Sequence, residues 1–285
     1  MEDSEFLCPD IRTEYEKDTT GQTTHHKEDK VTLLIWTPSG VKANHNKIAR
    51  RVFKLVKWIS KFPYSHFDSN KALSILLYLG TQKKTWCSDK KTLTICNVNS
   101  GETSFTKNYI EVRVFRREDC IKVLIHELLH AFRWDAVVEA KNPKDRWSWM
   151  PNEQEAFIEA NARFLYCHVL AKWFPQKTFT QYWQKELEWM KNQANFLRRS
   201  RWSTTTNAVA YYLMTIALLY AQNNEFLLWV HKSNKPAAKL REEWISERSK
   251  WWNHFYNNQQ TFWLPEQSSV ACSSLRMVAT QVSLE

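Results

Sequence analysis

The segment VLIHELLHAF, residues 123 to 132, places His126 and His130 four residues apart, with Glu127 directly after the first histidine. Residues at positions i and i+4 are neighbours on a helix surface, so both imidazoles can bind one metal ion. Glu127 would lie one step around the helix, where its carboxylate can take a proton from water on that metal. The spacing predicts a hydrolytic zinc site. The alternative is a buried helix whose histidines only form hydrogen bonds.

A catalytic zinc ion has three protein ligands and keeps a fourth position for water. Asp135 and Glu139 would point to the apolar side of the first helix if that helix continued. The later segment WMPNEQEAFIEANARF begins with a Pro-Asn helix start and places Glu155 and Glu159 on one face. We expect Glu155 to be the third ligand and Glu159 to accept a hydrogen bond from a ligand histidine. A solvated helix face is the alternative for both glutamates.

The HExxH segment and the ExxxExxA segment that begins at Glu155 together resemble the gluzincins, zinc metallopeptidases whose third ligand is a glutamate on the next helix. The resemblance spans residues 72 to 166, points to no single family, and has HExxH as its one short diagnostic motif. It implies an α+β, zincin-like fold, with a small N-terminal mixed β-sheet, an edge strand over the HExxH helix, and a predominantly helical C-terminal part. The chain departs from the thermolysin-like pattern, because Glu153 is followed four residues later by Phe157 and not by an aspartate. This favours Glu155 over Glu153.

The segment YIEVRVF, residues 109 to 115, alternates strictly between two sets of side chains. Its polar face carries Tyr109, Glu111 and Arg113, and its other face is aliphatic. Such alternation is typical of a half-exposed strand, and we expect it at the edge of the sheet. In zincin folds the edge strand before the metal-binding helix holds an extended substrate. The resemblance therefore implies that Tyr109, Glu111 and Arg113 lie on the substrate strand.

Peptide hydrolysis also needs a hydrogen-bond donor for the oxyanion, often a tyrosine or histidine from a distant element. The run STTTNAVAYYLMTIALL, residues 203 to 219, predicts a helix that opens at its Ser/Thr/Asn-rich end. Tyr211 and Tyr212 are adjacent and therefore point about 100° apart, so one can pack while the other faces the cleft. The alternative is two ordinary core aromatics, with His231 and His168 as the next candidates for the donor.

The domain organisation follows from composition. The last of four glycines is Gly101, which favours helices in the remainder of the chain. We expect one zincin-like domain over residues 31–265, with the sheet and metal helix in 31–135 and a helical part in 136–265. Its predicted strands are 31–36, 72–79, 92–96 and 109–115. Polar residues 1–30 predict a disordered segment, and Ser-rich residues 266–285 a flexible tail.

The chain is basic, with a formal net charge of +10 at pH 7. A basic surface can bind nucleic acid, an acidic polypeptide or an anionic membrane, or simply maintain solubility. The six cysteines include no CxxC pair, and the acidic N-terminus has no apolar signal region. These features favour an intracellular protein, cytoplasmic or nuclear. The apolar segment 208–221 is too short to span a membrane.

The sequence therefore favours a zinc metallopeptidase with one zinc ion per chain, whose polypeptide substrate would be acidic if the basic surface takes part in binding. Two alternatives remain open. One is a basic nucleic-acid-binding protein in which four protein ligands close a structural zinc site. The other is an inactive scaffold that keeps the zincin fold for partner binding.

Overall fold

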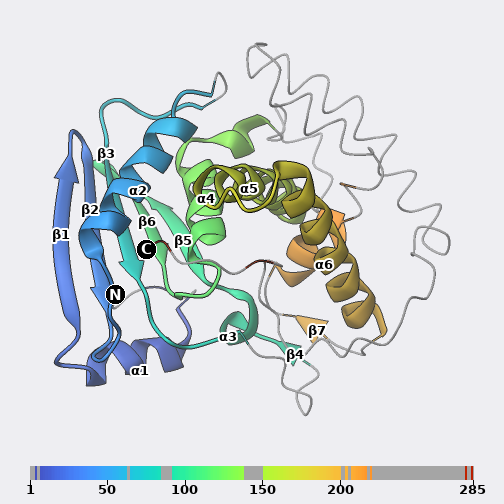
Figure 1. Ribbon diagram of the computed structural model, residues 1–285, viewed down its shortest axis with the longest axis horizontal. Helices are drawn as coiled ribbons and strands as arrows, with labels where there is room; N and C mark the ends of the chain where they lie inside the picture. The colour runs from blue at the N-terminus through green and yellow to red at the C-terminus, as the bar shows by residue number, and fades with distance from the viewer. Residues whose placement is uncertain are drawn as a thin grey trace.

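The computed structural model describes residues 7–62, 65–84, 92–137, 150–199, 203–204 and 207–216, together with residues 4, 219, 280 and 284. It is a mixed α/β structure with an N-terminal mixed sheet and helices after it, as the sequence predicts (Figure 1). The elements are α1 (Pro9–Lys17), β1 (Gln22–Glu28), β2 (Val31–Thr37), α2 (His45–Ile59), β3 (Ala72–Tyr78), β4 (Thr92–Leu93), α3 (Ile95–Val98), β5 (Gly101–Phe105), β6 (Tyr109–Val114), α4 (Cys120–Ala131), η1 (Trp134–Val137), α5 (Met150–Trp173), α6 (Phe179–Arg199), β7 (Ser203–Thr204) and the π-helix η3 (Val209–Met214).

The main sheet has the strand order β1-β2-β3-β6-β5. Strands β2, β3 and β6 are parallel, and antiparallel strands β1 and β5 flank them. The expectation that residues 109–115 form the edge strand is therefore wrong, because β6 pairs on both sides. Alternation of side chains reports which face of a strand is exposed, and it carries no information on which neighbours the strand has. Among the described strands, the edge beside the helices is β5.

The polar face of β6 has a different role from the one expected of a substrate strand. Arg113 forms an ion pair with Glu102 of β5, with Nη1 2.8 Å from Oε1, and a second pair with Glu111. Tyr109 is exposed. Tyr109, Glu111 and Arg113 thus belong to an interior strand of the sheet, and the Arg113 side chain links that strand to β5.

The hydrophobic core lies between the sheet and the helices. The buried side chains alternate along β6, as the sequence pattern predicts, and along most of β3, and those of α2 recur at helical spacing. Helix α4 is buried on every side except at His130, since α5 packs against it (Figure 1). Several of its polar residues therefore contact neighbouring elements, such as Lys122 and His126 with Glu159 of α5 and Glu127 with Thr103 of β5.

The N-terminal segment is ordered from residue 7 onwards, so the expected disorder of residues 1–30 is wrong for α1 and β1. Helix α1 begins with a proline and buries Ile11. Strand β1 is almost wholly polar and exposed, yet it pairs with β2 over its full length. Backbone hydrogen bonds need no apolar side chains, which is why composition alone misassigns such an edge strand.

A disulfide joins Cys8, directly before α1, to Cys96 in α3. Residues 92–96, predicted as one strand, instead form β4 followed by the start of α3. Disulfides persist mainly in oxidising compartments, so the cysteine pattern no longer supports the expectation of an intracellular protein. Within the described ranges, no helix is both long and apolar enough to cross a membrane.

The C-terminal segment is anchored at two residues that were expected to belong to a flexible tail. Leu284 is 1% exposed and belongs to the main core, and the carbonyl of Thr280 accepts a hydrogen bond from the Tyr166 hydroxyl. An anchor of this kind depends on tertiary docking, so a Ser-rich composition does not reveal it. The predicted helical character of residues 136–265 is confirmed for α5 and α6, whereas residues 220–265 lie outside the described residues.

Shortening the Leu284 side chain, which anchors the C-terminal segment, should destabilise the whole domain. Leu284→Ala removes a fully buried side chain and is expected to lower the free energy of unfolding by about 2–5 kcal/mol. Urea denaturation followed by circular dichroism measures this loss. Leu34→Ala, at a partly exposed position of β2, is the control and should have a smaller effect. A wild-type unfolding curve for Leu284→Ala would show that the C-terminal segment does not dock.

Candidate metal centre

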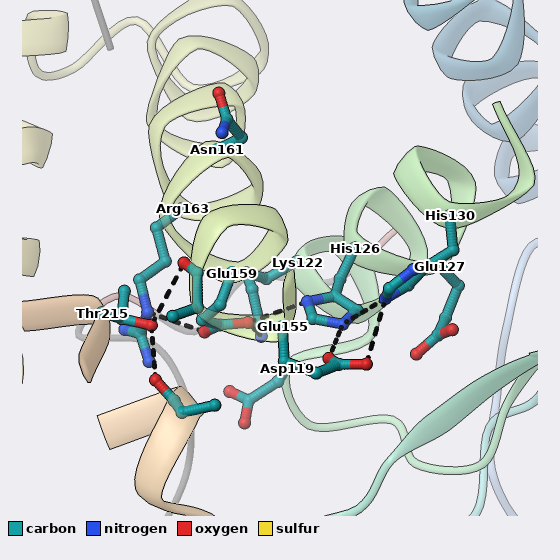
Figure 2. A network of polar contacts seen from close by, with 12 residues as sticks. Asp119, Lys122, His126, Glu127, His130, Glu155, Glu159, Asn161, Arg163 and Thr215 are labelled. Carbon is teal, nitrogen blue, oxygen red and sulfur yellow. Dashed lines mark hydrogen bonds and ion pairs between the residues drawn. The ribbon is translucent and has the colours of Figure 1, made fainter. Parts of the chain in front are cut away.

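The candidate site lies where α4 and α5 pack together. Helix α4 carries His126, Glu127 and His130, and α5 carries Glu155 and Glu159 on the face that meets them (Figure 2). The structure brings together the three residues predicted as ligands.

The three predicted ligands converge on one point. His126 Nε2 lies 3.2 Å from His130 Nε2 and 3.3 Å from Glu155 Oε2. His130 Nε2 lies 3.6 Å from Glu155 Oε1. These residues form a group that could hold a metal ion.

The opposite nitrogen of each imidazole contacts a carboxylate. His126 Nδ1 lies 3.0 Å from Glu159 Oε2, and His130 Nδ1 lies 3.3 Å from Asp135 Oδ2. An ionised carboxylate can only accept, so each Nδ1 carries a proton, and an imidazole that is neutral then presents a lone pair at Nε2. In that neutral form, two lone pairs and the Glu155 carboxylate face one another without a donor. Glu155 Oε2 is buried and meets no hydrogen-bond donor in suitable geometry among the described residues. A cation at their centre would satisfy all of them.

The carboxylates around the two histidines favour a positive charge where the three predicted ligands converge. Burial alone would lower the pKa of both imidazoles, but the surrounding carboxylates together outweigh it, Glu155 foremost among them. The pKa of His126 is therefore raised and that of His130 lies well above its ordinary value. Burial alone would raise the pKa of Glu155, yet the two histidines hold it far below its ordinary range. A metal cation supplies the same positive charge without the protons.

Asp135 is a residue whose role the sequence pattern did not reveal. It would point away from the histidines only if α4 continued, but α4 ends at Ala131 and Arg133 adopts a φ of +60°. The chain therefore turns into η1 and returns Asp135 to His130. The early helix end carries no glycine or proline, so no local signal marks it.

A buried charge network lies behind His126 (Figure 2). Glu159 accepts from Lys122 Nζ at 2.6 Å and from Arg163 Nε at 2.7 Å. Arg163 in turn donates to Glu186 of α6 at 2.5 Å. Burial opposes ionisation of Glu159, but Lys122 and Arg163 outweigh it and hold its pKa well below the ordinary value. Lys122 precedes His126 by four residues, so helical spacing could have identified it as a neighbour.

Glu127 lies beside the ligand group and outside it. Its Oε2 accepts a hydrogen bond from Thr103 Oγ1 of β5 at 2.8 Å. Burial raises the pKa of Glu127, against the lowering effect of the two histidines. Gly101 allows β5 to approach this closely, since a Cβ there would lie 2.7 Å from Val123 Cγ1 and 2.9 Å from Glu127 Oε1.

A cleft of about 250 Å³ opens over these residues. Strand β5 forms one wall, and Asn207 and Tyr211 form part of the other. The Tyr211 ring lies 5.8 Å from that of His126, whereas Tyr212 is 2% exposed and packs in a separate apolar cluster. Burial and the nearby glutamates hold the pKa of Tyr211 well above its ordinary value, so its hydroxyl stays protonated. These tyrosines lie in a π-helix, a form frequent at functional sites.

His168, the next predicted donor that the structure describes, does not line the cleft. His168 stacks on Phe179, with ring centroids 4.0 Å apart. His231 and the side chain of Glu153 lie outside what the structure describes. A second possible metal-ligand group contains Cys8, Asp10 and Cys96, but its two sulfur atoms are bonded to each other and leave no thiolate.

No protein-family model matches the chain, and no curated protein matches it either. The chemistry of the site therefore rests on its own geometry.

The two glutamates of α5 should affect metal binding to different degrees. Glu155→Gln removes a ligand and should abolish tight binding of Co²⁺, whereas Glu159→Gln loosens His126 and should weaken binding about 10- to 100-fold. Visible absorption during Co²⁺ titration measures both. The matched control is Glu188→Gln, at an exposed position of α6. Equal binding by wild type and Glu155→Gln would exclude Glu155 as a ligand.

Proposed function

We propose that the protein is a zinc-dependent metallopeptidase with a zincin-like fold. His126, His130 and Glu155 would hold the zinc ion, and Glu127 would be the general base. The observation that carries the proposal is the convergence of two imidazole lone pairs and a carboxylate on one buried point, with both Nδ1 atoms engaged by other carboxylates.

The donor set and its spacing support zinc. Bonds of 2.0–2.1 Å in a tetrahedral arrangement separate neighbouring ligand atoms by about 3.3–3.4 Å. The separations of 3.2, 3.3 and 3.6 Å agree with this value. Neutral imidazole and carboxylate are also the ligands of catalytic zinc sites in other hydrolases.

A catalytic site is favoured over a closed structural site. Among the described residues, the group that could hold the ion offers three ligands. All three line an open cleft together with Glu127, so a fourth position would face the cleft. This arrangement argues against the alternative in which four protein ligands close a structural zinc site in a nucleic-acid-binding protein.

Three polar residues of the cleft besides the metal ligands have a chemical role in this proposal. Zinc, when bound, would polarise the substrate carbonyl and lower the pKa of water. Glu127 would take a proton from the attacking water and pass it to the departing amine, while Thr103 fixes its carboxylate. The Tyr211 hydroxyl would donate a hydrogen bond to the developing oxyanion.

Strand β5 would bind the substrate as an additional strand, in place of the β6 residues expected from the sequence. The backbone N–H of Thr106 donates to the carbonyl of Tyr109, and the backbone N–H of Phe115 donates to the carbonyl of Ser100. These two bonds show which residues of β5 direct their backbone N–H and C=O groups toward β6. The backbone groups of Gly101, Thr103 and Phe105 consequently point to the free edge. An extended polypeptide could pair with them beside Glu127, which supports peptide hydrolysis over reactions on compact substrates.

Removal of the general base should separate metal binding from catalysis. Wild-type protein is expected to hold about one zinc ion per chain and to cleave peptides in a quenched-fluorescence library. Glu127→Gln should keep the zinc and lose turnover, because Glu127 acts on water and does not bind the metal. Elemental analysis and library cleavage measure the two properties. A zinc-loaded wild type without turnover would favour the scaffold alternative, and turnover by Glu127→Gln would exclude Glu127 from the mechanism.

The adjacent tyrosines provide a matched pair of variants. Tyr211→Phe should lower kcat about 10- to 1000-fold, as expected for loss of an oxyanion donor, with zinc content unchanged. Tyr212→Phe changes a side chain that packs away from the cleft and should leave kcat near the wild-type value. Steady-state kinetics on one peptide compare them. A wild-type kcat for Tyr211→Phe would require another donor.

A further inference from the structure

Phe105, at the end of β5, is an exposed aromatic residue that lies between two hollows of the surface. Its side chain is 44% exposed, although most large apolar side chains in the described part of the chain are covered. It lines the candidate catalytic cleft and also a second hollow of about 450 Å³. The ring therefore stands at the junction of the two.

The lining of the second hollow combines aromatic and aliphatic side chains with polar ones. Phe67 and Phe105 form walls, and the buried Ile110 of β6 lies opposite Phe105 in the sheet. Arg133 and Lys71 complete the lining together with Ser65, His66 and Asp68.

Several contacts hold this hollow in shape. The backbone N–H of His66 donates to the carbonyl of Phe132 at 2.8 Å, and the Phe67 ring lies 5.4 Å from the Phe132 ring. Lys71 Nζ donates to the carbonyl of Thr106 at 2.8 Å. The hollow is thus built from the end of α4, the segment before β3 and the β5–β6 turn.

The charged groups of the lining already have partners. The Lys71 ammonium is used at Thr106, and the Asp68 carboxylate accepts from the backbone of Asn70 at 3.0 Å. The Arg133 guanidinium lies 5.6 Å from the centre of the Phe105 ring and 3.8 Å from Asp135. The exposed surface of the Phe105 ring remains available for an incoming side chain to bury. This favours an apolar occupant over an acidic one.

We propose that the second hollow is a specificity subsite for a large apolar or aromatic side chain of the polypeptide substrate. The proposal rests on the peptidase function proposed above. Thr103 lies beside Glu127, and Phe105 is two residues further along the same face of β5. A substrate strand that pairs with β5 would also direct alternate side chains to one face of the sheet. The substrate residue whose side chain fills the hollow beside Phe105 would therefore be two positions from the substrate residue opposite Thr103.

Paired peptides test this subsite. Each set consists of three peptides that differ only in carrying Phe, Ala or Asp at one position. Successive sets place that position at each residue on either side of the cleaved bond. Wild type should prefer Phe over Ala at one position by about 10- to 100-fold in kcat/KM, the range expected for filling an apolar pocket. Phe105→Ala should reduce that ratio to near 1. Tyr109→Ala, a change of an exposed aromatic residue that does not line the hollow, should keep the wild-type ratio.

Binding to the inactive Glu127→Gln variant distinguishes failure of the subsite from failure of the peptidase proposal. Fluorescence anisotropy should show tighter binding of the Phe peptide than of the Ala peptide, and Phe105→Ala in the same background should remove the difference. Peptide cleavage without such discrimination would overturn the subsite. A preference for Asp that Arg133→Gln abolishes would also overturn it. Discriminating binding together with an uncleaved wild-type library would overturn the peptidase and retain the subsite.

Discussion

The pairing of the Glu159 carboxylate with two buried, positively charged side chains is the interaction on which the rest of the site depends. An ionised carboxylate is expensive to bury unless charged and hydrogen-bonded partners surround it, and Lys122 of α4 and Arg163 of α5 provide them. Because these partners come from two helices, the network also fixes how α4 and α5 lie against each other. The same carboxylate contacts His126 Nδ1, so helix packing and the orientation of a candidate ligand are determined by one group.

The second constraint is the close approach of β5 to α4. Gly101 has no side chain to separate them, and Thr103 donates to both the carbonyl and the carboxylate of Glu127. The free edge of the sheet therefore lies beside the proposed general base. In the proposed function, this juxtaposition would bring an extended substrate and the proton acceptor into one cleft, and the cleft continues beyond the candidate ligands to the hollow next to Phe105.

The burial of the charge network contrasts with the openness of the cleft. The cluster behind His126 is fully buried and charged, whereas the cleft above it is lined by Tyr211, Asn207 and the exposed ring of Phe105. Preorganised ligands with second carboxylates behind them are what metal catalysis requires of a protein. The absence of matching families leaves this arrangement of groups, and not ancestry, as the basis for the proposed reaction.

Local spacing in the sequence was sufficient for the residues that lie one helical turn apart. His126 and His130 share a face, as do Glu155 and Glu159, because the geometry of a helix depends only on neighbours within the chain. The alternation along β6 likewise identified the buried face of this strand. Features that depend on distant partners were decided only by the tertiary structure. They include β5 as the edge, Asp135 behind His130, the pairing of polar β1, and the anchoring of Leu284. The physical reason is that a strand neighbour, a helix end without a local signal and a buried terminus are set by packing between segments far apart in the sequence, which periodicity does not record.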